Sequence, residues 1–544
     1  MHIFLLFVNI INMNIKNFVD NLFKNNYNFS IVNNKNENCK NISTDQIKVY
    51  PQINKNLDFI KSKYNILINS DIKIREFETL AQNQTFKSFI VYFDGLVDSI
   101  SINDFVLEPL MFPKHVKNPD PNNLLNYIDN RLLPQNSVNK VNMFGKVCEG
   151  INMGDCLLFI DTLDVAFDID VKKFNARNVS KPENEIIIKG PHESFVENIR
   201  TNTSLLRRII NNENLIIENI PVGKISKTKC GICYMNNIAN SDLVSEIKYR
   251  LNNLDIDSLM STGQLEQLIE EDEIFGVPQV ISTERPDKCC KYLLQGRVVI
   301  LVNGNPYSII APANIEDFLF SPEDTNFRPI FTNFIRLIRI IAAIITLLLP
   351  GTYMAITSFH QEILPTELLL SILSARENVP FPIIFELLLM EFSFELIREA
   401  GLRVPSPIGS TIGIVGALIL GDAAVNAGIV SPTLIIIVAI TGISSFAIPD
   451  FSFGFHLRIF RFIFIALGFT AGFLGIGTGL FIYVTLICSL KSFGVPFTAP
   501  IAPSFNTKGN GYFIPPIWKQ EYRASFLSPK RIKAQADISM KWKQ

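Results

Sequence analysis

The uncharged stretch FIFIALGFTAGFLGIGTGLFIYVTLICSL, residues 462–490, decides the class of fold to expect. It holds 29 residues without Asp, Glu, Lys or Arg, whereas a bilayer-spanning helix needs about 20 apolar residues. A straight helix of this length would measure about 43 Å. We therefore expect the stretch to tilt, to extend past the lipid, or to break at one of its central glycines, which are Gly468, Gly472, Gly475, Gly477 and Gly479.

Three further uncharged stretches precede it, at 340–361, 404–421 and 423–449. Hydrophobic residues make up 48% of the 544-residue chain and charged residues only 19%, below the roughly one quarter that is usual in soluble domains. This composition indicates a membrane protein with soluble parts and excludes a mainly disordered chain. The net charge of −1 offers no excess of positive charge for nucleic acid.

The first topology that we expect has four membrane spans, at 338–357, 407–427, 430–449 and 459–489. It places Arg458 and Arg461 on the outer side, which the positive-inside rule disfavours. An alternative with six crossings adds Phe381–Ile397 and splits the last stretch into two legs. It improves the charge distribution but makes both legs short for a bilayer, so both topologies stay open.

The region 360–400 is predicted to form amphipathic helices that carry an acidic stripe. Glu391, Glu395 and Glu399 are four residues apart and share one helix face, and Arg398 can pair with Glu395. Ionisable groups at membrane depth usually face a partner or water. Glu391 and Glu395 therefore either line a cation path among several copies of the chain, or belong to a helix that lies flat on the membrane with its carboxylates in water.

Small residues recur in PIGSTIGIVGALILGDAAVNAG, residues 407–428. They let helices approach closely in lipid, and the candidates for such packing are Gly409, Gly413, Gly416, Ala417 and Gly421. The same face would also suit a helix that lines a pore. Asp422, between two apolar stretches, is then either a charge at a pore mouth or a helix-end residue near water.

The N-terminal half has the pattern of a soluble α/β region. Short apolar runs at 89–93, 156–160 and 298–302 predict strands, and apolar residues three and four apart predict helices at 198–211 and 242–254. The domains that we expect are a disordered Asn-rich lead-in (1–50), two α/β subdomains (51–185 and 186–328), a helical membrane domain (329–490) and a basic tail (491–544).

The ends of the chain are predicted to be cytoplasmic. The first residues, MHIFLLFVNIINMN, lack the features of a signal peptide, and the tail adjoins the last span with many Lys and Arg residues. The expected fold is therefore an α/β cytoplasmic region followed by an α-helical transmembrane domain.

Motifs for catalysis, cofactors or metals are weak. The chain has no Walker A or HExxH spacing, and Cys230–Cys233 is a lone CxxC. Zinc would need two more ligands, for which Cys289 and Cys290 could serve, but buried thiols acting as small hydrophobes are the more economical reading. We predict no enzyme active site, no cofactor and no metal.

Long motifs in this sequence resemble the A subunits of bacterial spore germinant receptors, the GerA family. The stretches that carry the resemblance are YFDGLVD (92–98), GPHESFVENIRTNTSLLRRII (190–210), IDSLMSTGQLEQLIEE (256–271), FGVPQVISTERPDKCCKYLLQGRVVILVNGNP (275–306), SPED (321–324), FIRLIRIIAAIITLLLPGTYMAITSFHQEILPTELLLSI (334–372), PIGSTIGIVGALILGDAAVNAGIVSP (407–432) and SLKSFGVPFTAPIAP (489–503). The resemblance as a whole covers about residues 70 to 525.

This resemblance implies a multi-pass protein of the spore inner membrane that senses nutrients together with a transporter-like B subunit and a lipoprotein C subunit. It also implies a homo-oligomer that works as a nutrient-gated cation channel. From the residues themselves, the basic tail is expected to bind anionic membrane lipid. A non-conducting scaffold that couples a nutrient-binding partner to later events is the alternative. In that case Arg200, Arg207 and Arg208, on one amphipathic helix, would make subunit contacts, unless they form a solvated face.

One loop of the soluble region lies in the matching stretch 275–306. The segment TERPDK, Thr283–Lys288, is expected to lie at the start of a helix. Its acids Glu284 and Asp287 would either cap that helix or belong to a plain turn.

Overall fold

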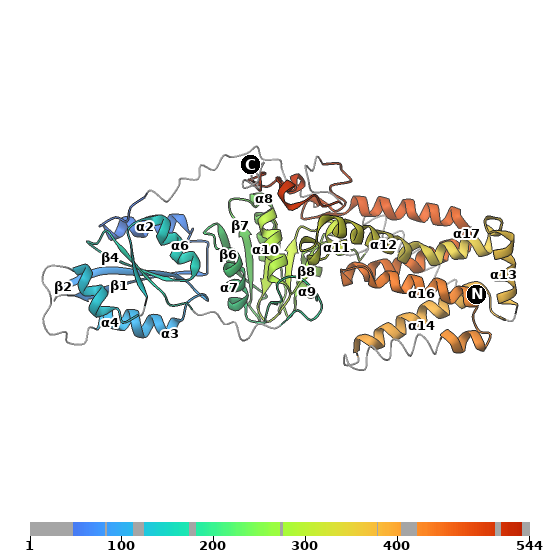
Figure 1. Ribbon diagram of the computed structural model, residues 1–544, viewed down its shortest axis with the longest axis horizontal. Coiled ribbons are helices and arrows are strands. Elements are labelled where there is room, and N and C mark those ends of the chain that lie inside the picture. Colours follow the sequence, from blue (N-terminus) through green and yellow to red (C-terminus); the bar gives the residue numbers. More distant parts are fainter. Residues whose placement is uncertain are drawn as a thin grey trace.

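The computed structural model describes residues 47–81, 84–112, 124–135, 137–172, 181–271, 276–377, 379–403, 421–505 and 513–535. Two α/β subdomains and a group of helices follow one another along the long axis of the molecule (Figure 1). The N-terminal region is thus α/β, as the sequence predicts. The expected lead-in at 1–50 lies outside the described residues except for 47–50.

The first subdomain, residues 47–172, has a five-stranded antiparallel sheet in the order β1-β2-β4-β5-β3. Its strands are β1 (Ile72–Ala81), β2 (Gln84–Phe93), β3 (Val138–Val141), β4 (Cys156–Ile160) and β5 (Ala166–Ile169). Its helices are α2 (Ile53–Lys63), α3 (Ser99–Ile102), α4 (Glu108–Met111), α5 (Leu124–Tyr127) and α6 (Phe144–Met153), with π-helical turns at Asn103–Leu107 and Ile128–Leu132. The predicted strand at 156–160 is confirmed as β4, and all five of its residues are buried.

The second subdomain, residues 199–325, also has a five-stranded antiparallel sheet, in the order β6-β7-β9-β10-β8. Its strands are β6 (Leu215–Val222), β7 (Thr228–Met235), β8 (Ile281–Thr283), β9 (Val298–Val302) and β10 (Ser308–Ala311). Its helices are α7 (Ile199–Ile209), α8 (Ser241–Asn252), α9 (Thr262–Ile269), α10 (Pro286–Gln295) and α11 (Ile315–Leu319), followed by a 3₁₀ turn at Pro322–Thr325. The predicted strand at 298–302 and the helices expected at 198–211 and 242–254 are confirmed.

The two subdomains repeat one topology. If the strands are numbered from one within each sheet, both sheets have the order 1-2-4-5-3. In both, a helix precedes the first strand and another precedes the fourth. The two units therefore share an architecture of more than 100 residues, although their sequences show no short repeating period.

A buried ion pair joins the two subdomains. Arg207 of α7, only 2% exposed, donates from Nε to Asp71 Oδ2 at 2.7 Å and from Nη2 to Asp71 Oδ1 at 3.0 Å. Its guanidinium also lies 4.1 Å from the centre of the Phe93 ring. Beside it, the Ser70 amide donates to the Ile217 carbonyl on edge strand β6 at 2.9 Å. Arg207 thus makes its contacts within the chain.

Between residues 329 and 489 the described part of the chain is mainly helical. Its helices are α12 (Pro329–Ser358), α13 (Thr366–Arg376), α14 (Ile383–Arg403), α16 (Pro432–Phe446) and α17 (Phe451–Ser489), with a 3₁₀ turn at Gln361–Ile363. Among the residues described here, α12 and α17 are long and apolar enough to cross a membrane, while α16 is a shorter apolar helix. The spans expected at 338–357 and 459–489 fall on the two long helices. Most of the span expected at 407–427 lies outside the described residues.

Helix α17 is a hairpin of two legs. Gly472 has φ 59° and ψ −140°, which interrupts the helix, so a break at a glycine is the one of the three expected alternatives that the structure shows. Beyond the break the second leg folds back on the first: a Cβ on Gly475 would stand 2.3 Å from the Leu467 carbonyl oxygen. His456 Nε2 on the first leg likewise lies 3.1 Å from the Tyr483 hydroxyl on the second. The ring centres of Phe453, near the start of α17, and Phe318 of the second subdomain are 5.7 Å apart, and Ser492, just past its end, contacts Ala313, so both ends of α17 reach the second subdomain.

Replacing Gly472 with Ala should destabilise the hairpin by about 1–3 kcal/mol, because this backbone conformation is essentially restricted to glycine. The new Cβ would also lie 2.7 Å from His360 Cε1. Thermal unfolding of the detergent-solubilised chain measures the loss. Gly477→Ala is the matched control, since a Cβ there meets no atom within 4 Å. Equal melting temperatures for the two variants would show that the turn does not need glycine.

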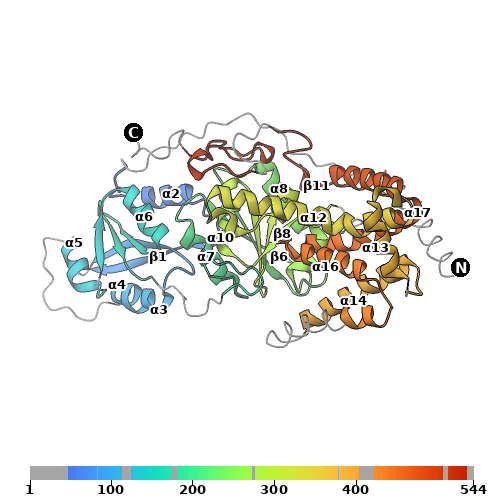
Figure 2. The ribbon, with the colours of Figure 1, turned by 45° about the vertical axis from the view of Figure 1, so that its right-hand side comes forward.

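After α17 the chain returns to the second subdomain. A two-stranded ribbon, β11 (Lys491–Ser492) and β12 (Val495–Pro496), follows the hairpin, with 3₁₀ turns at Ile517–Lys519 and Ser525–Leu527. Ser492 Oγ accepts from the Ala313 amide at 3.0 Å and donates to the Gln279 carbonyl. Figures 1 and 2 show the last segment, in dark red, running back along this subdomain. Parts of the predicted basic tail, among them Ser492, Arg523 and Lys530, are thus packed against the second subdomain.

Candidate functional site

The acidic stripe of α14 faces the first leg of α17. Glu391 is fully buried, and its Oε2 lies 2.9 Å from Nη2 of Arg461, which is also fully buried. The same Nη2 donates to Glu395 Oε1 at 3.0 Å. Arg458, one turn before Arg461, completes the cluster with its Nη1 3.7 Å from Glu395 Oε2. Two carboxylates and two guanidinium groups thus meet inside the helical domain.

Hydrogen bonds do not use all the polar atoms of this cluster. The 2.9 Å contact of Glu391 is an ion pair without hydrogen-bond alignment, and neither of its carboxylate oxygens has a hydrogen-bond partner among the described residues. The same holds for Nε and Nη1 of Arg461 and of Arg458. Attraction between opposite charges is strong in such a low-dielectric setting, but the desolvation cost is high as well. Polar groups arranged in this way retain the capacity to bind water or an ion.

The other residues of the stripe have different surroundings. Glu399 is exposed. Arg398, expected as a partner of Glu395, donates instead to Ser445 Oγ at 3.3 Å, and its guanidinium lies 4.6 Å from the centre of the Phe446 ring. The partner of Glu391 and Glu395 is therefore α17, and not Arg398 on α14 itself.

The residues expected around the small-residue stretch are only partly described. Gly421 is buried, and a Cβ there would make ordinary contact with Ile435 of α16 at 3.8 Å. Asp422 is exposed. The remaining packing candidates, Gly409, Gly413, Gly416 and Ala417, lie outside the described residues, and their role stays a prediction.

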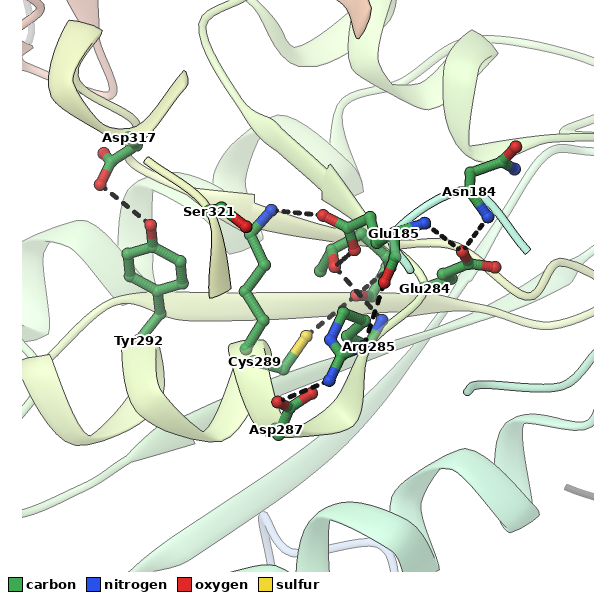
Figure 3. Close-up of polar contacts among 12 residues, drawn as sticks. Asn184, Glu185, Glu284, Arg285, Asp287, Cys289, Tyr292, Asp317 and Ser321 are labelled. Carbon is green, nitrogen blue, oxygen red and sulfur yellow. Dashed lines mark hydrogen bonds and ion pairs between the residues drawn. The ribbon is translucent and has the colours of Figure 1, made fainter. Parts of the chain in front are cut away.

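A second polar cluster anchors the linker between the subdomains, residues 181–198, to the second subdomain (Figure 3). Glu284 Oε1 accepts from the backbone amides of Asn184 and Glu185 at 2.7 and 2.9 Å. Arg285, with no exposed surface, donates to the Glu185 carbonyl at 3.1 Å and to Asp287 Oδ2 at 2.9 Å. The TERPDK loop thus holds the linker in place.

The expected helix does begin in this loop, at Pro286, but no side chain caps it. The capping alternative is wrong because Glu284 turns to the linker amides. Asp287 lies in the first turn of α10, where it contacts Arg285.

Comparison with protein families identifies the group of proteins to which this chain is related. The model of the Bacillus/Clostridium GerA spore germination protein matches residues 58–526. The chain belongs to the GerA family. It is therefore a spore germination protein, and the resemblance stated from the sequence is confirmed.

Several relatives of this GerA-family chain carry germination names. It is 37% identical to spore germination protein KA of Bacillus subtilis (strain 168), over 89% of this chain and 88% of the relative. It is 36% identical to spore germination protein GerLA of Bacillus cereus, over 83% and 89% of the two chains. A third relative, 35% identical over 82% of this chain and 86% of its own length, is named uncharacterized membrane protein YfkQ of Bacillus subtilis (strain 168).

One solved structure also matches the GerA-family chain. It is the crystal structure of the N-terminal domain of the A subunit of the Bacillus megaterium spore germinant receptor GerK3. The sequence identity is 31%, the TM-score is 0.37, and the match covers 49% of this chain and 97% of that one.

Sequence reasoning missed another buried acid of this GerA-family chain. Glu386, 1% exposed, accepts from Arg376 Nη2 at 3.0 Å and from the Ser431 amide at 3.1 Å. Ser431 precedes α16, so the carboxylate lies at the positive end of that helix. The signal was present in the sequence, because Glu386 is a single acid within the apolar run PFPIIFELLLM.

The four cysteines considered for zinc are buried in the second subdomain of the GerA-family chain. Burial raises the pKa of each thiol well above its usual value, which disfavours the thiolate that metal binding requires. Within the described ranges no three His, Cys, Asp or Glu side chains gather as a metal site would need. The cysteines therefore act as small apolar residues of the core.

Proposed function

We propose that this chain is the A subunit of a nutrient-sensing germinant receptor, and that its helical domain oligomerises into a nutrient-gated cation channel. Membership of the GerA family and the germination names of its relatives support the receptor role. The observation that supports a channel is that two carboxylates, Glu391 and Glu395, pair with Arg461 within an apolar group of helices. Charged groups at membrane depth are costly and are usually retained for ion pathways or relays.

In the proposed mechanism, the conformation described here is a closed one. Arg461 neutralises the stripe from the neighbouring helix, so a cation gains little by approaching Glu391 or Glu395. Opening would move α17 relative to α14 and exchange the guanidinium for hydrated cations. Nutrient binding by a partner subunit would supply the free energy for this exchange.

Helix directions favour six crossings of the membrane. Contacts of Glu386 with Ser431 and of Arg398 with Ser445 make α14 and α16 parallel. Both run towards the second subdomain, whereas α12 runs away from it and α17 runs out and back. With a span at 407–427 these helices give six crossings and leave both chain ends on one side. The multi-pass arrangement in the spore inner membrane, with a cytoplasmic N-terminal region and tail, is part of this proposal.

The partners that we propose are a transporter-like B subunit, a lipoprotein C subunit and further copies of the chain. A non-conducting scaffold is the second candidate, supported by the extensive linker anchor in Figure 3. Purified protein in liposomes separates the two functions. Rings of subunits with cation conductance would support the channel, and monomers without conductance would support the scaffold.

The acidic stripe requires a balanced variant as its test. Replacing Glu391 and Glu395 with Gln would leave Arg461 buried without a counter-charge, so the chain could unfold for that reason alone. The quadruple variant Glu391→Gln, Glu395→Gln, Arg458→Met, Arg461→Met removes all four charges of the cluster together. We expect spores with this variant to release cations several-fold more slowly in a mixed nutrient medium, at normal protein levels. Unchanged release would exclude a path lined by these carboxylates.

A further inference from the structure

An exposed apolar surface lies where α12 leaves the second subdomain. Ile330, Phe331 and Phe334, in the first two turns of α12, are 81%, 60% and 63% exposed. They precede the uncharged length of the helix, which begins after Arg339. The acyl core of a bilayer that starts near Arg339 would therefore not cover them. Apolar surface of this kind in water marks a site of interaction.

The C-terminal segment extends this surface. The Asn333 side chain accepts from the Ile514 amide at 2.8 Å and donates to the Ile514 carbonyl at 3.2 Å, which fixes the segment against α12. Phe513 and Ile517, on either side of Ile514, are 66% and 64% exposed. Two segments that are far apart in the sequence are thus joined at the Asn333–Ile514 contact, and we treat the exposed apolar side chains that flank this contact as one surface. We call it the interfacial patch; its members are Ile330, Phe331, Phe334, Phe513 and Ile517.

The surroundings of the patch match a membrane–water boundary. Trp518 is 44% exposed next to Ile517, and the cationic residues Arg328 and Lys519 are exposed at the two segments. Aromatic residues with Lys and Arg are enriched at the headgroup level of membranes. Six residues separate Asn333 from the start of the uncharged length, about 9 Å along a helix. The headgroup layer is of similar thickness, roughly 5–8 Å on each side of the acyl core.

We propose that the interfacial patch inserts into the headgroup region of an anionic bilayer, on the side that carries the α/β subdomains. Its apolar side chains are continuous with the apolar surface of α12, and its cations complement anionic headgroups. The segment at 513–519 is then a second membrane attachment, independent of the crossing helices. A non-conducting chain would be anchored in the same way, so the inference does not depend on the channel.

The experiment uses the scarcity of tryptophan. The sequence has two, Trp518 and Trp542, so Trp542→Phe in the full chain leaves Trp518 as the only reporter. The variant is reconstituted into vesicles of phosphatidylcholine or phosphatidylglycerol brominated near the headgroup. We expect a loss of Trp518 emission relative to unbrominated vesicles, and a larger loss with the anionic lipid. Ile517→Ser should reduce the quenching, whereas Ile225→Ser should not, because Ile225 is at least as exposed (78% against 64%) but lies on a turn of the second subdomain.

Two outcomes would overturn the proposal. Emission that bromine leaves unchanged but acrylamide quenches would place the segment in water. Emission that neither quenches would mean that protein covers the patch, either a second copy or a partner subunit. Flotation of the protein with the vesicles is scored in parallel, so that failure of the patch is distinguished from failure of the membrane helices to insert.

Discussion

Replacing Arg461 with Met is expected to lower the free energy of unfolding by about 3–5 kcal/mol, because it leaves a buried carboxylate without its counter-charge. Glu391 has no exposed surface and its ion pair is with Arg461. Glu395 loses less, since it is 26% exposed and remains near Arg458. Chemical unfolding in detergent measures the effect, which is among the largest that a single substitution in this chain should produce.

The matched control restores neutrality. In the double variant Arg461→Met, Glu391→Gln both members of the fully buried pair become uncharged, and replacement of a buried pair by neutral groups is often close to neutral in free energy. We expect the double variant to recover most of the loss. A single variant as stable as the wild-type chain, or a double variant no better than the single one, would contradict the pairing of α14 with α17.

The second large effect is expected at the junction of the subdomains. Arg207→Met should cost about 3–5 kcal/mol, because Asp71 is only 8% exposed and would lose two charge-assisted hydrogen bonds. The stacking of the guanidinium on Phe93 is lost as well. The linker at 181–198 should then become more sensitive to limited proteolysis, since the two subdomains are no longer held together.

A neighbouring arginine provides the control. Arg208 pairs with Glu193, but the side chains are 29% and 42% exposed, and exposed pairs contribute about 0–1 kcal/mol. Arg208→Met should therefore leave stability and proteolysis close to wild type. Equal effects of the two substitutions would mean that Arg207 acts through general charge and not through its contact with Asp71.

Local patterns were sufficient to predict many elements but few of their partners. The all-apolar runs at 156–160 and 298–302 indicate buried strands because both faces of each are covered, and Gly472 could be included among the break points because it lies within an over-long stretch. Spacing on one helix, however, reveals only neighbours three or four residues away. It suggested Arg398 for Glu395, whereas the residue that pairs is Arg461, 66 positions along the chain.

The same limit applies to the soluble part. A basic residue on an amphipathic helix has the same sequence pattern whether it faces solvent or an acid of another subdomain, so the burial of Arg207 was not predictable. The shared strand order of the two subdomains also escaped detection, because topology is retained by hydrogen-bond registers that tolerate different side chains. The buried contacts of Glu386, by contrast, could have been predicted, since a single acid in an apolar run indicates a buried partner.

The hairpin of α17 has a mechanical consequence. Because its two legs start and finish on the second subdomain, and the chain after it is bonded to Gln279 and Ala313, any tilt of the legs pulls on that sheet from two attachment points. Bending of either leg would therefore strain the sheet to which both legs are attached. Shortening the polypeptide from its carboxyl end would release one of these attachments and uncouple the buried charges of the bundle from the sheet of the second subdomain.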